Sequence, residues 1–177
     1  MNKKIWNTSG EKQSNEVTAF LAGEDIELDK SIFIYDIQAS IAHVNNLFSI
    51  GIIKKGESTK IIKSLKDLKK KFQEGSFKLT NKYEDCHSAI EFYLTKELGE
   101  LGKKVHTGRS RNDQVIVAMR LFAKQNLINF KIENKLVAKT LLKLAKKHEN
   151  YQMPGYTHLQ RAMPSSWGLW FSSYASW

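Results

Sequence analysis

The sequence predicts an all-α protein. Apolar residues recur at spacings of three and four along several segments, neither glycine nor proline occurs between Gly108 and Pro154, and no segment shows the repeated two-residue alternation of a half-buried strand. Of the 177 residues, 41% are hydrophobic and 26% are charged, as in globular proteins. Because no apolar run approaches the roughly 20 residues that a membrane helix needs, we expect no membrane partner.

Three shorter helices are expected first, over residues 32–48, 58–72 and 85–101. Each carries apolar residues on one helical face, and Gly51 follows the first of them. Residues 75–79 have extended character at most. We expect these helices to form a small N-terminal helical domain over residues 1–111.

A much longer helix is expected from about Asn112 to about His148. At roughly 1.5 Å per residue it would be about 55 Å long, too long to be buried in a compact domain of this size. We therefore expect it to pack in an extended bundle, on helices that the chain does not contain. Residues 112–177 would be the beginning of a central bundle domain. We expect that domain to be truncated, because the chain stops at Trp177 within an apolar run.

The net charge of +10 raises the question of a nucleic-acid partner. Between Lys54 and Lys82 there are ten lysines against Glu57, Asp67 and Glu74, so most of the excess lies in one segment. Grooves that follow phosphates usually mix arginine and aromatic side chains with lysine. A solvated lysine-rich helix face is the better interpretation, and no nucleic-acid partner is expected. The single cysteine, Cys86, allows no internal disulfide, so the cytoplasm is the expected location.

Residues 105–114 are unusually rich in hydrogen-bond donors. They contain His106, Thr107, Ser110, Asn112 and two arginines at the start of the expected long helix. Arginine can hold a carboxylate through two parallel bonds, and the free N–H groups of a helix start add fixed donors. This pattern suits a small ligand with several carboxylates. An ordinary solvated loop with a helix cap remains an equal alternative.

A second polar segment, residues 153–164, follows the long helix. Pro154 and Gly155 predict a turn, after which Thr157 and His158 offer a hydroxyl and an imidazole. Histidine can transfer protons near neutral pH, although a loop histidine can also simply bond a carbonyl. If the two polar segments cooperate across so long a helix, they must meet between different subunits.

Two further histidines and the cysteine are candidates for other roles. His87 follows Glu84-Asp85-Cys86 near a helix start and could orient a ligand or support a cap, whereas His43 is expected on a packed helix face. No pair of histidine and glutamate has zinc-protease spacing, and Cys86 and His87 would need further ligands from elsewhere. No metal site is expected.

At these motifs the chain resembles the argininosuccinate lyases of the fumarase/aspartase superfamily. The resemblance rests on HTGRSRNDQ at residues 106–114 and PGYTHLQRA at residues 154–162, supported by YDIQASIAH at residues 35–43 and EDCH at residues 84–87. It extends over nearly the whole chain. The first motif is specific to these lyases, whereas the superfamily shares only the broader architecture.

The resemblance implies a reversible β-elimination that splits argininosuccinate into arginine and fumarate without a cofactor. It also implies a homotetramer built on a central bundle of long helices, with each active site assembled from three subunits. Ser110, Arg111 and Asn112 would hold the succinate part of the substrate, and His87 would support the site. Thr157 would bind a carboxylate beside the catalytic histidine, His158. Prearranged donors of this kind can stabilise the charged intermediate formed when a proton leaves the carbon next to a carboxylate.

The chain also departs from the family pattern. The family's glycine-rich loop with a catalytic serine is absent, so the isolated chain is expected to be inactive. Residues 6–10 and 20–25 replace two N-terminal family segments, and the substrate-binding serine of the second is missing. The alternatives are a non-catalytic, crystallin-like homologue, an inactive fragment, or a related lyase acting on another succinyl compound.

Overall fold

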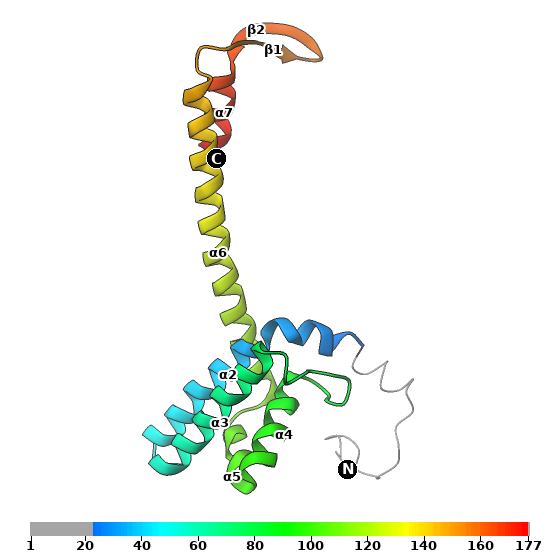
Figure 1. Cartoon of the computed structure of the whole chain (residues 1–177), viewed down its shortest axis with the longest axis vertical. Coiled ribbons are helices and arrows are strands. Elements are labelled where there is room, and N and C mark those ends of the chain that lie inside the picture. The colour runs from blue at the N-terminus through cyan, green and yellow to red at the C-terminus, as the bar shows by residue number, and fades with distance from the viewer. Residues whose placement is uncertain (1–22, 177) are drawn as a thin grey trace. The chain divides into compact units, whose positions relative to one another are not determined.

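A computed structural model describes residues 23–176 and confirms the all-α class (Figure 1). Residues 1–22 and 177, which include the departure at residues 6–10 and the start of the one at 20–25, lie outside the described residues. The elements in chain order are α2 (Asp25–Ser49), α3 (Lys55–Gln73), α4 (Cys86–Leu98), α5 (Glu100–Lys103), the 3₁₀ turn η1 (Lys104–His106), α6 (Arg111–Lys147), β1 (Gln152–Thr157), β2 (Gln160–Ser166) and α7 (Trp167–Ala175). None of the helices in this part of the chain is long and apolar enough to cross a membrane.

The chain divides into two compact units, Met1–Ala123 and Lys124–Trp177, and the division falls inside α6. The sequence places its domain boundary between residues 111 and 112, where α6 begins. That boundary stays a prediction. Each unit is described by itself below.

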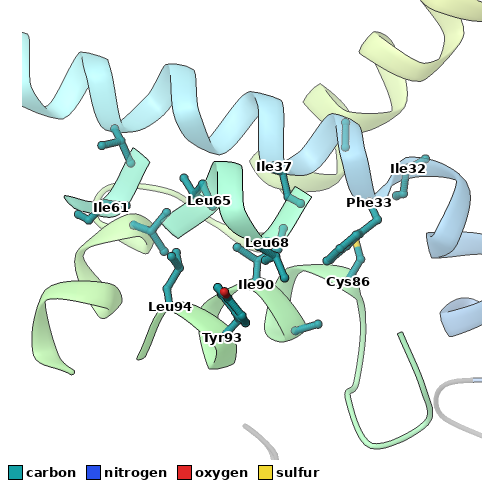
Figure 2. Packing of buried hydrophobic residues seen from close by; sticks show 14 of the residues in the cluster. Ile32, Phe33, Ile37, Ile61, Leu65, Leu68, Cys86, Ile90, Tyr93 and Leu94 are labelled. Atoms are coloured by element: carbon teal, nitrogen blue, oxygen red, sulfur yellow. The ribbon is translucent and has the colours of Figure 1, made fainter. Parts of the chain in front are cut away.

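The first unit is organised around α2, α3 and α4, which pack on one another (Figure 2). Their facing sides supply a core of apolar residues that are almost completely buried: Phe33, Ile37, Val44, Ile61, Leu65, Leu68, Ile90 and Leu94. Burying an aliphatic or aromatic side chain of this size contributes roughly 1.5–3 kcal/mol. The apolar residues that recur at helical spacing in the sequence therefore form this core.

One expected helix is divided in two. The sequence predicts a single helix over residues 85–101, whereas α4 ends at Leu98 and α5 starts at Glu100, with Gly99 between them at φ 61°. The start of α4 is well defined, because Asp85 accepts a hydrogen bond from Ser88 N at 2.7 Å and Ser88 Oγ accepts one from Asp85 N at 3.1 Å. This reciprocal capping fixes the first turn of α4 beside the candidate site.

Helix α6 is continuous over 37 residues, as the absence of glycine and proline predicts. In the first unit its Ala118 is fully buried, and Phe122 makes an edge-to-face contact with Tyr35 at a centroid distance of 5.8 Å. Beyond this start, many of its large apolar side chains are exposed: Leu127, Ile128, Phe130, Ile132, Leu136, Val137 and Leu142. Exposed apolar surface of this extent is typical of a surface that another protein covers.

The second unit contains an antiparallel hairpin that the sequence analysis did not predict. Strand β1 pairs with β2, with an irregularity between Pro154 and Tyr156. Its residues are mostly exposed, which explains why the sequence shows no alternation of apolar and polar residues there. Helix α7 packs back on the end of α6 at Gly168, where a Cβ atom would lie 2.8 Å from Glu149 Cα. Only glycine allows so close an approach of the two backbones.

Candidate active site

The donor-rich segment lies at the start of α6, immediately after a tight turn. Gly108 adopts φ 70°, in the left-handed region that favours glycine. Ser110 then caps the helix: its N–H and hydroxyl both bond Asp113 Oδ2, at 2.8 and 3.0 Å. These hydrogen bonds hold the pKa of Asp113 below its ordinary value. This segment therefore does contain a helix cap, as one of the two interpretations of the sequence expects. Asn112, next to the cap, is exposed.

Arg111 is held in place by residues of the first turns of α4 and α6. Its Nε lies 3.3 Å from Asp85 Oδ2, and its Nη1 lies 3.2 Å from Glu91 Oε1 and 3.1 Å from Gln114 Oε1. The side chain is 27% exposed, so it is neither buried in the core nor free in solvent. These contacts fix the Arg111 cation at the start of α6. A ligand carboxylate bound there would also contact the free N–H groups of the first helical turn.

The turn before α6 is bound to α2 through two side chains. Arg109 donates from both terminal nitrogens to Ser40 Oγ, each at 3.3 Å, and from Nη2 to the carbonyl oxygen of Val105 at 2.8 Å. His43 Nε2 lies 2.9 Å from the carbonyl oxygen of Thr107 and donates to it. Burial lowers the pKa of Arg109 and of His43, and the nearby Arg109 cation lowers that of His43 further.

His87 is buried at the start of α4, and its Nδ1 lies 2.6 Å from Oδ2 of the fully buried Asp36. Cys86 Sγ is 3.7 Å from His87 Nδ1 and 4.0 Å from Asp36 Oδ2, so these three residues could in principle hold a metal ion. The direct His87–Asp36 hydrogen bond occupies the space between their ligand atoms. Burial, followed by the nearby Asp36 and Asp29 carboxylates, raises the pKa of the Cys86 thiol far above its usual range and disfavours the thiolate that a metal needs. The arrangement thus favours a hydrogen-bonded pair.

Thr157 and His158 lie at the tip of the hairpin in the second unit. His158 and Leu159 form its two-residue turn with φ values of 49° and 64°, and Thr157 pairs with Gln160 across it. A two-residue hairpin turn of this type requires positive φ at both of its central residues. Both predicted residues are exposed. The structure thus brings Ser110, Arg111, Asn112 and His87 into one unit and places Thr157 and His158 in the other.

Three residues that shape the site were not selected from the sequence: Asp36, Ser40 and Glu91. Asp36 and Ser40 are fully buried polar residues on a helix whose other buried positions are mostly apolar. That signal is visible in the sequence, since both fall within the motif at residues 35–43. The sequence does not single out Glu91, because a single carboxylate on a helix is common.

The family model described as Lyase matches residues 13–177, and the chain belongs to this family. The chain is 44% identical over 171 residues to the argininosuccinate lyase of Stenotrophomonas maltophilia (strain K279a), covering 97% of this chain and 40% of that protein. It is also 44% identical over 171 residues to the argininosuccinate lyase of Xylella fastidiosa (strain 9a5c), covering 97% of this chain and 38% of that protein. The chain thus spans about 40% of the length of these relatives.

Solved structures share the same fold. An EDDS lyase variant with bound fumarate superposes with a TM-score of 0.72 at 25% identity, covering 94% of this chain and 33% of that one. A fumarate lyase from Mesorhizobium sp. BNC1 superposes with a TM-score of 0.65 at 21% identity, covering 94% of this chain and 39% of that one. The latter likeness concerns the fold alone.

Proposed function

We propose that the chain supplies part of the active site of an argininosuccinate lyase, which reversibly splits argininosuccinate into arginine and fumarate. One observation carries the proposal: Arg111 is fixed at the start of α6 by Asp85 and Glu91, within the motif that the argininosuccinate lyases share. The relatives named argininosuccinate lyase, at 44% identity, favour this substrate over another succinyl compound.

In this proposal, the start of α6 binds the dicarboxylate part of the substrate. Arg111 and the hydroxyl of Ser110 face a carboxylate together with the first helix N–H groups, and Asn112 adds an amide donor. Ser110 would then exchange its bond to Asp113 for one to the ligand. His87 supports the site, with its ring oriented by Asp36.

The hairpin tip supplies the remaining chemistry. Thr157 binds a carboxylate. The electrons of the C–H bond form the double bond of fumarate as the C–N bond breaks to release arginine, and His158 serves this proton transfer as a general acid or base. Fixed donors at the carboxylates stabilise the negative charge that develops when the proton leaves the neighbouring carbon. No cofactor is needed for this elimination.

The assembly is part of the proposal. We infer a homotetramer in which the exposed apolar surface of α6 packs in a bundle of long helices and segments of different subunits form each site. Location in the cytoplasm fits the single buried cysteine. Because the relatives are much longer than these 177 residues, we also infer that the 177 residues alone do not turn over substrate.

The test is fumarate release from argininosuccinate, followed by ultraviolet absorbance, with the full-length protein that the gene encodes. We expect turnover, and we expect His158→Asn to reduce kcat by about 100-fold or more, as loss of a general acid or base does. A folded full-length protein that binds argininosuccinate without releasing fumarate would instead support a non-catalytic homologue. Wild-type turnover by His158→Asn would remove the role given to His158.

The closest matched control is His148→Asn. His148 lies at the end of α6, where its ring contacts Tyr151 at a centroid distance of 5.4 Å, and it has no role in the proposed chemistry. This variant removes one imidazole from the same unit of the chain. Turnover by His148→Asn should stay close to that of the wild type.

A further inference from the structure

Helix α2 carries a stripe of three polar side chains, of which the proposed chemistry uses only Asp36, to orient His87. Asp36, Ser40 and His43 are spaced at i, i+4 and i+7, which places them on one helical face. Asp36 and Ser40 are fully buried, and His43 is half-buried. Burying polar groups costs free energy unless they find partners, and each of the three side chains has a partner for at least one of its polar atoms.

Each member of this positioning stripe bonds a different segment of the candidate site. Asp36 bonds the ring of His87 at the start of α4, at 2.6 Å. Ser40 accepts both terminal nitrogens of Arg109, and His43 bonds the carbonyl oxygen of Thr107 at 2.9 Å. One helix face thus connects α2 to the start of α4 and to the turn that precedes α6.

The contacts on the turn lie immediately before the proposed ligand-binding residues. Thr107 and Arg109 flank Gly108, whose backbone conformation reverses the chain, and Ser110 follows directly. The free N–H groups of the first helical turn and the cap hydroxyl can face a ligand only if this turn is held in one place. The bonds to Ser40 and His43 tie this turn to α2.

The contact on α4 has a separate consequence. Asp36 accepts the Nδ1 proton of His87, and this bond favours the tautomer whose ring lone pair lies on Nε2, where it is a hydrogen-bond acceptor. The same helix face therefore sets both the position of the turn and the tautomer of a supporting histidine.

We propose that Asp36, Ser40 and His43 are positioning residues that hold the turn at residues 107–109 and the His87 ring for substrate binding. That these residues affect substrate binding rests on the proposed function. That they fix the position of the turn rests on the hydrogen bonds alone. None of the three bonds Ser110, Arg111 or Asn112 directly, so their role is to place the segments that do.

The first test measures hydrogen exchange of the backbone amides of residues 105–111 in the full-length protein. Ser40→Ala and His43→Leu are each expected to speed this exchange about five- to tenfold, because the first removes the two hydrogen bonds from Arg109 and the second removes the one to Thr107. Amides of α3 should exchange as in the wild type. His43→Gln should restore slow exchange, since its amide can donate to the carbonyl of Thr107.

Ser64→Ala is the matched control, because Ser64 is a buried serine on α3, outside the stripe on α2. It should leave exchange at residues 105–111 unchanged. The proposal is overturned if Ser40→Ala and His43→Leu exchange like the wild type at the turn, or if α3 exchanges faster by the same factor. If His43→Leu fails to fold, the exchange rate of residues 105–111 in Ser40→Ala tests the proposal.

The second test separates the stripe from the proposed activity. In the fumarate assay, Ser40→Ala is expected to raise KM for argininosuccinate about fivefold or more and to lower kcat less, because it loosens a binding segment without touching the reacting atoms. An unchanged KM together with faster exchange would refute the link to substrate binding. If the wild type shows no lyase activity, the proposed function fails, and the exchange result still decides whether the stripe holds the turn.

Discussion

Replacing Arg111 with lysine removes the planar guanidinium while keeping the positive charge. Arg111 reaches Asp85 through Nε and Glu91 and Gln114 through Nη1, at 3.1–3.3 Å. A lysine ammonium is a compact point charge that cannot contact two separated carboxylates in this forked geometry. We therefore expect Arg111→Lys to lose at least one of the two charged contacts.

The size of the loss follows from the burial of the pair. Exposed ion pairs contribute about 0.2–1 kcal/mol, and hydrogen bonds to charged groups contribute about 1.5–3 kcal/mol when water is excluded. Arg111 and Glu91 are 27% and 26% exposed, between these two cases. We expect the free energy of unfolding to fall by about 1 kcal/mol. KM for argininosuccinate should rise about tenfold or more, because the cation is no longer held at the helix start by the contacts of the guanidinium.

The assays are urea unfolding of the full-length protein, with an unchanged m-value as the check on two-state behaviour, and steady-state kinetics of fumarate release. Arg120→Lys, at an exposed position farther along α6, is the control and should change neither quantity. The reasoning is refuted if Arg111→Lys unfolds and turns over like Arg120→Lys.

Two further predictions concern stability. Phe33 is completely buried and contacts Phe72 and Phe77 at centroid distances of 4.6 and 5.7 Å. Phe33→Ala should therefore lower the free energy of unfolding, measured by denaturant titration, by about 3–5 kcal/mol. A decrease of less than about 1 kcal/mol would contradict this packing. The pKa of Asp113 is lowered in the folded state, so its stabilisation is fully present above its ordinary value of 3.8 and is lost as the pH falls through the lower folded value. The difference in unfolding free energy between the wild type and Asp113→Asn should therefore become smaller as the pH falls below about 4. A difference that grows on acidification would contradict a lowered pKa of Asp113 in the folded state.

Helical periodicity was enough to predict most of the fold. The spacing of Ile37, Ile61 and Leu65 identifies faces that the structure buries, and the glycine-free span predicts α6 within a residue at each end. The hairpin could not be predicted this way, because strand patterns depend on one buried face and β1 and β2 have almost none. Gly99 and Gly102 mark the end of the helix predicted over residues 85–101, but apolar residues continue on both sides of Gly99, so the separate helix α5 was not predicted.

The candidate site was predictable only where it lies in motifs. Arg111 stands in a dense run of donors, and the structure shows it held by carboxylates at a helix start. Asp36 and Ser40 contribute through contacts with residues 51 and 69 positions away along the chain, and such pairings arise from packing. Sequence spacing on α2 shows that the two share a face, but only the packed helices show what that face bonds.

We propose that the start of α6 from one subunit and the hairpin tip from another subunit form one catalytic site. The most direct measurement mixes two full-length variants, Arg111→Ala and His158→Asn, each expected to be nearly inactive by itself, and follows fumarate release after they are unfolded and refolded together. If a site takes the two segments from different subunits, random mixing leaves about a quarter of the sites with both segments intact. The account predicts recovery of about that fraction of wild-type turnover. If both segments came from the same subunit, every site would contain one defect, and a mixture no more active than the separate variants would contradict the account.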